Sequence, residues 1–200
     1  MVTLGALARF EAKPGNEAAV ERFFQEGLSI VQQQPASTIW FAFRLESTTF
    51  GAFAAFANEE ERQALLSVGG PVLAQRHSAL FVHPPTFEKV DVLAAKRPRG
   101  ANSPTVGSLV GFKARSGKEA DWERYLKEAL IAIQEAPGTT AWFAFRLDSS
   151  TFGVFDTFSD EEGRQAHFLA GAGRSEKASD LLEIPPVVEK VDVFAARLPE

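Results

Sequence analysis

The sequence predicts an α+β fold built from two ferredoxin-like βαββαβ repeats. The first observation is an internal duplication: residues 38–64 and 140–166 align without gaps at an offset of 102, and 18 of the 27 positions are identical. The second is the order of hydrophobic patterns, which reads strand, helix, strand, strand, helix, strand in each copy. We therefore expect a first repeat over 1–97, a linker over 98–104 and a second repeat over 105–200.

The boundary between the repeats is marked by composition. The segment KRPRGANSPT at 96–105 contains two prolines, a glycine and several polar residues, which is typical of a linker. Just before it lies PPTFEKVDVLAA at 84–95, which matches PPVVEKVDVFAA at 185–196 at an offset of 101. Two copies are too few for a solenoid, and they suit a gene-fused dimer whose halves share an interface.

The first strand is expected over about 4–13 and ends at the turn Pro14-Gly15. A helix follows, because apolar residues recur at spacings of 3, 1, 3, 1 and 3, which is one face of a 3.6-residue period. Pro35 ends this helix, and Pro137 ends its counterpart in the second repeat. The apolar positions are Val20, Phe23, Phe24, Gly27, Leu28 and Val31 in the first repeat, and Trp122, Tyr125, Leu126, Ala129, Leu130 and Ile133 in the second.

A hairpin, a second helix and a last strand complete each repeat. Two alternating, aromatic-rich strands are expected over about 38–46 and 49–57, and the last strand over about 86–95. Asn58 with Glu61 forms a capping-box pattern for the second helix. In the second repeat Asp160 caps the matching helix, and the glycine-containing segments 68–71 and 170–173 are expected to break the second helix of their repeats.

A four-stranded sheet with both helices on one face leaves its other face bare, and that face must be covered. Within one chain the second repeat can cover the first, so that the two sheets curl into a barrel with the helices outside. At each seam of such a barrel, the second strand of one repeat would meet the last strand of the other.

Composition and charge exclude several classes of function. The chain is 45% hydrophobic and 24% charged, as expected of a folded domain, and its longest apolar runs are too short to span a bilayer. Residues 1–100 carry 10 basic and 10 acidic side chains, and residues 101–200 carry 11 and 16, so neither half has the basic excess that nucleic acid requires. With no cysteine and no signal pattern at the start, we expect a cytoplasmic protein with neither a nucleic-acid nor a membrane partner.

One strand face in each repeat combines tryptophan with arginine. Period-two alternation puts Trp40 and Arg44 on the same face, and the second repeat has Trp142 and Arg146 in the same places. An indole can stack on a flat ring, and a guanidinium can hold a phenolate oxygen and lower its pKa. The alternative is structural: Arg44 and Arg146 would pair with Asp192 and Asp91, respectively, across the barrel seams.

The two repeats differ at three apolar positions, and each time the second repeat is polar. Phe23 becomes Tyr125, Ala54 becomes Asp156, and Leu65 becomes His167. A carboxylate in the middle of a buried strand is costly unless it is paired or functional. Asp156 and His167 can therefore form an acid–base pair for a phenolic proton, or else be satisfied structural polar groups.

Other site chemistries find little support. The remaining histidines, His77 and His83, have no histidine counterpart in the second repeat, and without cysteine a structural zinc site is not expected. The glycine clusters lack the Lys-Ser/Thr of a phosphate loop. We expect no metal and no cofactor.

Two segments carry a family resemblance. TFGVFDTFSDEEGRQAHFLAG and PPVVEKVDVFAARLP resemble the antibiotic biosynthesis monooxygenase family, and the likeness covers most of each repeat. It implies an intramolecular dimeric α+β barrel. It also implies an activity such as the cofactor-free oxygenation of quinols and polycyclic phenols. FDTF and RQAH in the second repeat fit the family pattern, whereas FAAF and RQAL in the first depart from it, which places the retained site in the second repeat.

The functional hypothesis is a cofactor-independent oxygenase acting on a flat phenolic or quinol-type molecule, with O₂ as cosubstrate. The substrate would enter between the sheet and the helices of the second repeat. The alternative is a non-catalytic barrel that binds a small molecule. The quaternary state is expected to be a monomeric pseudo-dimer or a homodimer. The catalytic candidates are His167, Asp156, Arg146 and Trp142, and the substrate-binding candidates are Trp40, Arg44, Tyr125, Phe152 and Phe158.

Overall fold

The computed structural model describes residues 2–35, 38–98 and 104–199. Each repeat has the predicted βαββαβ order. The first repeat consists of β1 (Leu4–Glu11), α1 (Glu17–Val31), β2 (Ile39–Arg44), β3 (Thr49–Phe56), α2 (Glu59–Val68), α3 (Gly70–Arg76), the short 3₁₀ turn η1 (Ser78–Leu80) and β4 (Thr86–Lys96). The second consists of β5 (Val106–Lys113), α4 (Glu119–Glu135), β6 (Thr139–Arg146), β7 (Thr151–Phe158), α5 (Glu161–Lys177), η2 (Ser179–Leu181) and β8 (Val187–Arg197).

The two repeats exchange their last strands. In one compact unit the hydrogen-bonded order is β1-β3-β2-β8, and in the other it is β5-β7-β6-β4. Strand β8 runs antiparallel to β2, with Arg44 opposite Asp192, and β4 runs antiparallel to β6, with Asp91 opposite Arg146. These are the pairings expected at the seams of an intramolecular dimeric α+β barrel, and the predicted α+β fold class is confirmed.

The compact units therefore differ from the sequence repeats. The first unit contains the chain up to Lys89 and the segment from Val191 onward, whereas residues 90–98 and Pro104–Lys190 belong to the second. A strand belongs to the sheet with which it forms its hydrogen bonds, so the crossover of β4 and β8 moves the boundary away from the linker. Of the predicted linker 98–104, residues 99–103 lie outside the described residues.

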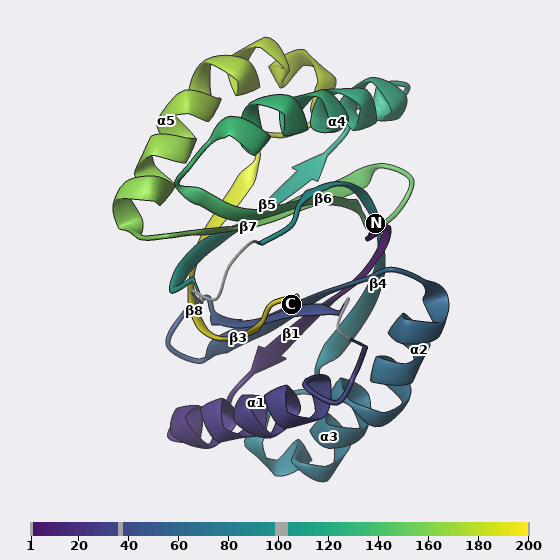
Figure 1. Ribbon diagram of the computed structural model, residues 1–200, viewed down its shortest axis with the longest axis vertical. Helices are drawn as coiled ribbons and strands as arrows, with labels where there is room; N and C mark the ends of the chain where they lie inside the picture. Colours follow the sequence, from purple (N-terminus) through teal and green to yellow (C-terminus); the bar gives the residue numbers. More distant parts are fainter. Residues whose placement is uncertain (1, 36–37, 99–103, 200) are drawn as a thin grey trace. The chain divides into compact units, whose positions relative to one another are not determined.

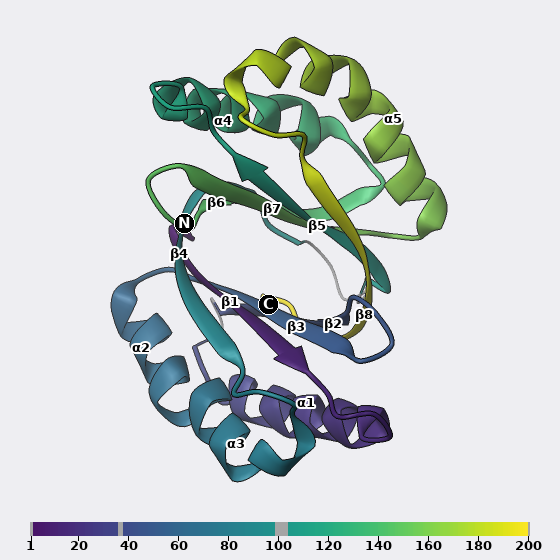
Figure 2. The ribbon, with the colours of Figure 1, turned by 180° about the vertical axis from the view of Figure 1, so that it is seen from behind.

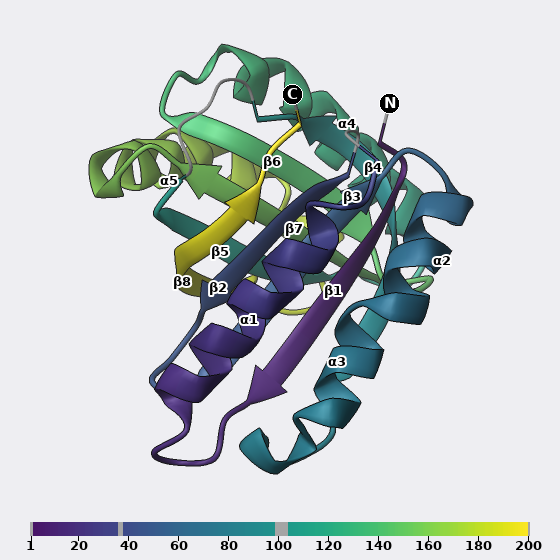
Figure 3. The same ribbon diagram turned by 60° about the horizontal axis from the view of Figure 1, so that its bottom comes forward.

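Helices cover one face of the sheet in each unit. Figure 3 shows α1 and the α2–α3 pair on the same side of β1, β3 and β2. In the second unit α4 and α5 lie over β5, β7 and β6 (Figures 1 and 2). The predicted apolar face of the first helix is confirmed, because Val20, Phe23, Phe24 and Val31 are buried there. Trp122, Leu126 and Ile133 are buried on α4.

The predicted caps of the second helices form as the sequence suggests. The Asn58 side chain accepts a hydrogen bond from the backbone N–H of Glu61 at 2.9 Å, and the Glu61 carboxylate accepts one from the backbone N–H of Ala57 at 3.2 Å. Asp160 accepts a hydrogen bond from the backbone N–H of Gly163 at 2.8 Å. These bonds satisfy amide groups that have no partner within the helix.

One helix break was predicted correctly and the other was not. In the first repeat the helix is interrupted at Gly69, where a Cβ would lie 2.6 Å from the carbonyl oxygen of Leu65, and Pro71 then opens α3. In the second repeat the predicted break at 170–173 is wrong, because α5 continues to Lys177. That segment has no proline, and a Cβ at Gly171 would meet nothing within 4 Å, so its glycines lower helix propensity without forcing an interruption.

A glycine lies under a phenylalanine ring at matching places in the two sheets. Gly51 is opposite Phe43 and Gly153 is opposite Phe145 in the strand register. A Cβ would lie 2.3 Å from the Phe43 ring at Gly51 and 2.4 Å from the Phe145 ring at Gly153. Both rings are fully buried. The glycine leaves the space that the ring of the neighbouring strand occupies.

We expect Gly153→Ala and Gly51→Ala each to lower the free energy of unfolding by about 2 kcal/mol, since the added methyl would displace a packed ring. Urea unfolding measures the change. Gly111→Ala on β5 is the matched control, because a Cβ there meets nothing within 4 Å and its effect should stay within about 0.5 kcal/mol. Equal effects at all three positions would contradict the packing argument.

Candidate functional site

The second unit has a cavity of about 330 Å³ between its sheet and its helices, and this cavity is partly open to the surface. The walls come from β5, β6 and β7 on one side, from α4 and α5 on the other, and from the start of β8. Most of the lining side chains are aliphatic or aromatic, among them Trp122, Trp142 and Phe168. Three polar side chains reach this wall: Tyr125, Asp156 and His167. The cavity is large enough for a flat ring system, since an engineered cavity of about 150 Å³ binds benzene.

Asp156 lies in the middle of β7 and is only 1% exposed. In the sheet it is opposite Ser108 of β5 on one side and Trp142 of β6 on the other. The Ser108 hydroxyl donates a short hydrogen bond to Oδ1 of Asp156. The other carboxylate oxygen, Oδ2, lies 3.3 Å from Nε2 of His167. The carboxylate is thus held from the sheet side and contacts an imidazole on the helix side.

His167 reaches this carboxylate from α5. Its side chain is 14% exposed, and its second nitrogen, Nδ1, lies 3.1 Å from the hydroxyl of Thr139 at the start of β6. The imidazole centroid is 5.1 Å from that of Phe158, which limits how the ring can turn. Ser108, Asp156, His167 and Thr139 form one connected series of side chains, which we call the polar network.

The position of Asp156 controls its proton affinity. Burial disfavours the charged carboxylate and raises its pKa to about 7. The hydrogen bond from Ser108 and the positive charge of Arg164 lower the pKa, but their effect is smaller than that of burial. Arg164 is itself buried, and it donates a hydrogen bond to the carbonyl of Gly107 at 3.0 Å. A carboxyl group with a pKa near neutrality can both accept and release a proton under ordinary conditions.

The first unit has a cavity at the equivalent place, but its chemistry differs. Its volume is about 60 Å³, and its lining residues include Ala6, Ala54 and Leu65. At the offset of 102, these are the counterparts of Ser108, Asp156 and His167. Within the described residues, the series Ser108-Asp156-His167 is therefore confined to the second repeat.

The structure brings several predicted site residues to the larger cavity. Asp156, His167, Trp142 and Tyr125 line it together. The Tyr125 ring stacks on Trp122, with centroids 4.9 Å apart. Phe158 is buried and packs on His167 rather than lining the cavity, and Phe152 belongs to the apolar core of the same unit.

Arg146 is not among the cavity residues. It ends β6, where its Nη1 lies 3.1 Å from Glu123 of α4 and its Nη2 lies 3.3 Å from Asp91 of β4. The period-two pattern puts Arg146 on the face of Trp142 but four residues further along the strand, at the end of the sheet where acidic side chains meet it. The sequence left two interpretations of Arg146 open, a contact with the substrate or an ion pair with Asp91. The structure shows the ion pair with Asp91.

Trp40 and Arg44 belong to the first unit. Trp40 lines the smaller cavity. Arg44 forms an ion pair with Glu21, and its guanidinium carbon lies 5.0 Å from the centre of the Phe50 ring. Arg44 is opposite Asp192 in the strand register, but the predicted ion pair between them is not the one that forms, because the guanidinium pairs with Glu21 of α1 instead. The guanidinium is held at the end of its strand, as in the second unit.

Sequence analysis missed two members of the polar network, Ser108 and Thr139. Ser108 replaces Ala6 at the same offset that revealed Asp156, so a comparison of the first strands of the two repeats would have found it. Thr139 begins β6, where a threonine is ordinary in any strand. Only the contact between the Thr139 hydroxyl and Nδ1 of His167 indicates a role for this threonine.

The described part of the chain has neither a cluster of metal ligands nor a membrane-spanning helix. Across residues 2–35, 38–98 and 104–199, histidine and carboxylate side chains nowhere gather in groups of three or more that could hold a metal ion. None of the helices in this part of the chain combines the length and the apolar character that crossing a membrane requires.

Solved structures identify the fold. No protein-family model matches the sequence, and no curated protein does. A proposed monooxygenase from Fusobacterium nucleatum has a TM-score of 0.85 and 12% identity, with 98% of this chain and 94% of that chain covered. A proposed monooxygenase from Lactobacillus acidophilus has a TM-score of 0.83 and 8% identity over 100% and 97% of the two chains.

A third neighbour carries the family name expected from the sequence. It is a ferredoxin-fold protein from Listeria monocytogenes that is related to antibiotic biosynthesis monooxygenases. It has a TM-score of 0.57 and 8% identity over 98% of this chain and 96% of its own. The chain described here therefore has the fold of the ferredoxin-like proteins related to antibiotic biosynthesis monooxygenases.

Proposed function

We propose that the chain is an oxygenase that acts on a flat, hydroxylated aromatic molecule bound in the cavity of the second unit. The observation that carries this proposal is the contact between Asp156 and His167 in the wall of an otherwise apolar cavity of about 330 Å³. Keeping a carboxyl group at a buried position costs stability, and the first repeat avoids that cost with an alanine. Such a group is typical of a site with a chemical task.

The reaction starts with removal of the hydroxyl proton of the substrate by the Asp156–His167 pair. The resulting anion is electron-rich and transfers one electron to O₂, and the two radicals combine into a C–O bond. Loss of water from the peroxide leaves a carbonyl group. The substrate gains one oxygen atom and loses two hydrogens, and the second oxygen leaves as water. All four electrons that reduce O₂ come from the substrate, which ends as the carbonyl product.

The chain's own residues bind the ring and move this proton. Trp142 and the Trp122–Tyr125 stack offer aromatic surfaces to a flat ring. Asp156 accepts the proton, and His167 contacts the carboxylate and can share the charge. Arg146 has no part in the site, because its guanidinium is taken up by Glu123 and Asp91. The description of two structural neighbours as monooxygenases supports the reaction class.

An oxygen electrode with a small panel of quinols and fused-ring phenols tests the proposal. We expect uptake above the autoxidation blank for at least one compound, and we expect His167→Leu, which installs the residue of the first repeat, to reduce it towards the blank. His77→Leu is the matched control: this imidazole pairs with Glu26 in the first repeat, away from the cavity lining, and uptake should not change.

Ligand binding separates this proposal from its alternative. Quenching of tryptophan fluorescence would report a ring that enters beside Trp142 and Trp122. Binding without oxygen uptake at any pH from 6 to 9 would contradict the oxygenase and favour a small-molecule-binding protein. Uptake that is the same in wild type and His167→Leu would remove the assigned site.

A further inference from the structure

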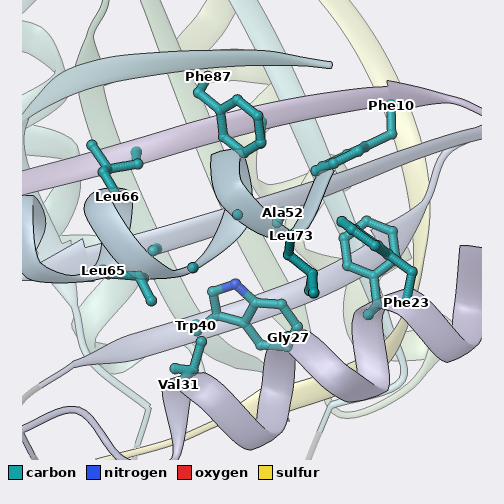
Figure 4. Close-up of a pocket in the computed structure, with 16 residues that line it drawn as sticks. Phe10, Phe23, Gly27, Val31, Trp40, Ala52, Leu65, Leu66, Leu73 and Phe87 are labelled. Carbon is teal, nitrogen blue, oxygen red and sulfur yellow. The ribbon is translucent and has the colours of Figure 1, made fainter. Parts of the chain in front are cut away.

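The smaller cavity, in the first unit, has a uniform apolar lining. Its lining side chains are all alanine, glycine, valine, leucine, phenylalanine or tryptophan, and Figure 4 shows Trp40, Leu65, Leu73 and Gly27 around it. The residues come from β1, β2, β3 and the start of β4 on the sheet side and from α1, α2 and α3 on the helix side. The indole nitrogen of Trp40 is the single nitrogen or oxygen among these lining side chains.

Three lining positions of the smaller cavity carry a large apolar side chain where the second repeat has a different residue. Leu65 occupies the place of His167, Phe24 the place of Leu126, and Phe87 the place of Val188. Phe87 packs closely, since a Cβ on Gly70 would lie 2.6 Å from its ring. Leu73 is buried on α3, the separate helix that follows the break at Gly69. A remaining volume of about 60 Å³ is too small for an aromatic ring, which takes about 150 Å³.

Water is a poor occupant of this cavity. A buried water molecule needs two to four polar partners, and one molecule fits in about 10–15 Å³, so space is not what excludes it. The lining side chains offer no such set of partners. An apolar molecule of one or two atoms, in contrast, recovers the dispersion contacts that the walls lose when they face a void.

We propose that this cavity is a binding site for a small apolar gas molecule, with dioxygen as its natural ligand and xenon as the probe. Dioxygen is apolar and diatomic, and it fits an apolar volume of about 60 Å³ that is too small for an aromatic ring. The inference goes beyond the oxygenase proposal, because it concerns the other unit and needs no turnover. The second repeat would bind the aromatic molecule, and the first would bind the gas.

Methyl NMR of the whole chain under xenon pressure tests the site. We expect saturable shifts in the methyl signals of Ala6, Ala52, Ala54, Leu65 and Leu73, all of which line the cavity. Replacing nitrogen by oxygen should then broaden the same signals through the paramagnetism of O₂. Shifts confined to surface methyl groups would overturn the site, and xenon shifts without oxygen broadening would overturn dioxygen as its ligand.

Gly27→Ala is the variant that decides the location. Its Cβ would lie 3.9 Å from Cδ2 of Leu73 and 4.0 Å from Cζ2 of Trp40, so the methyl enters the cavity without displacing a neighbour. We expect xenon binding to weaken about tenfold, because the added methyl group fills part of the volume that a xenon atom would occupy. Ala52→Val, which installs the residue of the second repeat, should act in the same direction.

Gly111→Ala on β5 is the matched control, because a Cβ there meets nothing within 4 Å and Gly111 lines neither cavity. It makes the same chemical change in the other unit, and we expect xenon binding in the smaller cavity to be unchanged. Unaltered xenon affinity in both Gly27→Ala and Ala52→Val would overturn the proposal, as would an ordered water molecule in this cavity in a crystal structure.

Discussion

Asp156→Asn is expected to stabilise the folded chain, and the gain should be larger at pH 8 than at pH 5. The wild-type carboxyl group is 1% exposed, and burial raises its pKa to about 7. Asparagine keeps the shape and can still accept the hydrogen bond from Ser108, but it never carries a charge. The substitution therefore removes the cost of burying a carboxylate and keeps most of the packing.

The direction follows from proton binding in the two states. Between pH 4 and pH 7 the unfolded Asp156 has lost its proton while the folded one still holds it. Rising pH therefore lowers the stability of the wild-type fold across this window. A rise in the pKa of Asp156 from 3.8 to about 7 lowers the free energy of unfolding by roughly 4 kcal/mol over the full pH window. From pH 5 to pH 8 the advantage of the variant should grow by about 2–3 kcal/mol.

Urea unfolding of both proteins at several pH values measures this difference, and subtraction cancels the other titrating groups. Asp148→Asn is the matched control, because hydrogen bonds from Ser150 and Thr151 lower the pKa of that exposed carboxyl group. Replacing the Asp148 carboxyl group should become more destabilising, not less, as the pH rises through the pKa of Asp148. If the advantage of Asp156→Asn is the same at pH 5 and pH 8, Asp156 does not titrate near neutrality.

Much of the fold could be predicted because its signals are local or repeated. The helical spacing that starts at Val20 and the capping pair Asn58–Glu61 each specify an element from its own residues. The duplication then constrains what covers the bare sheet. The continuation of α5 through Gly171 was not predictable in the same way, since glycine permits a break and the surroundings decide whether one forms.

The candidate site was predictable where the repeats disagree. Asp156 and His167 stand out because an apolar residue occupies each equivalent place, and the structure places them 3.3 Å apart. Arg146 was assigned to the site because it shares a strand face with Trp142. A strand face extends over several residue pairs, and the sequence does not say which of them lies under the cavity and which meets Glu123 and Asp91.

Ser108→Ala is expected to shift the pH dependence of the proposed reaction. If Asp156 must be ionised to accept the substrate proton, kcat/KM falls about tenfold per pH unit below its pKa of about 7. The Ser108 hydroxyl donates to that carboxylate and so favours the charged form. Removing it raises the pKa further. A hydrogen bond to a charged group contributes about 1.5–3 kcal/mol, which corresponds to a shift of about one to two units.

The expected result is a loss of kcat/KM by about 5- to 50-fold at pH 7, where half of the wild-type carboxyl groups are already protonated, with recovery towards the wild-type value near pH 9. A purely structural defect would instead lower kcat/KM equally at every pH. Carbon NMR of the Asp156 carboxyl group measures the same shift without any substrate, so the role of Ser108 can be judged even if the proposed reaction fails. An unchanged carboxyl pKa in Ser108→Ala would show that burial alone controls Asp156, and that the hydroxyl from β5 does not tune the proton affinity of the site.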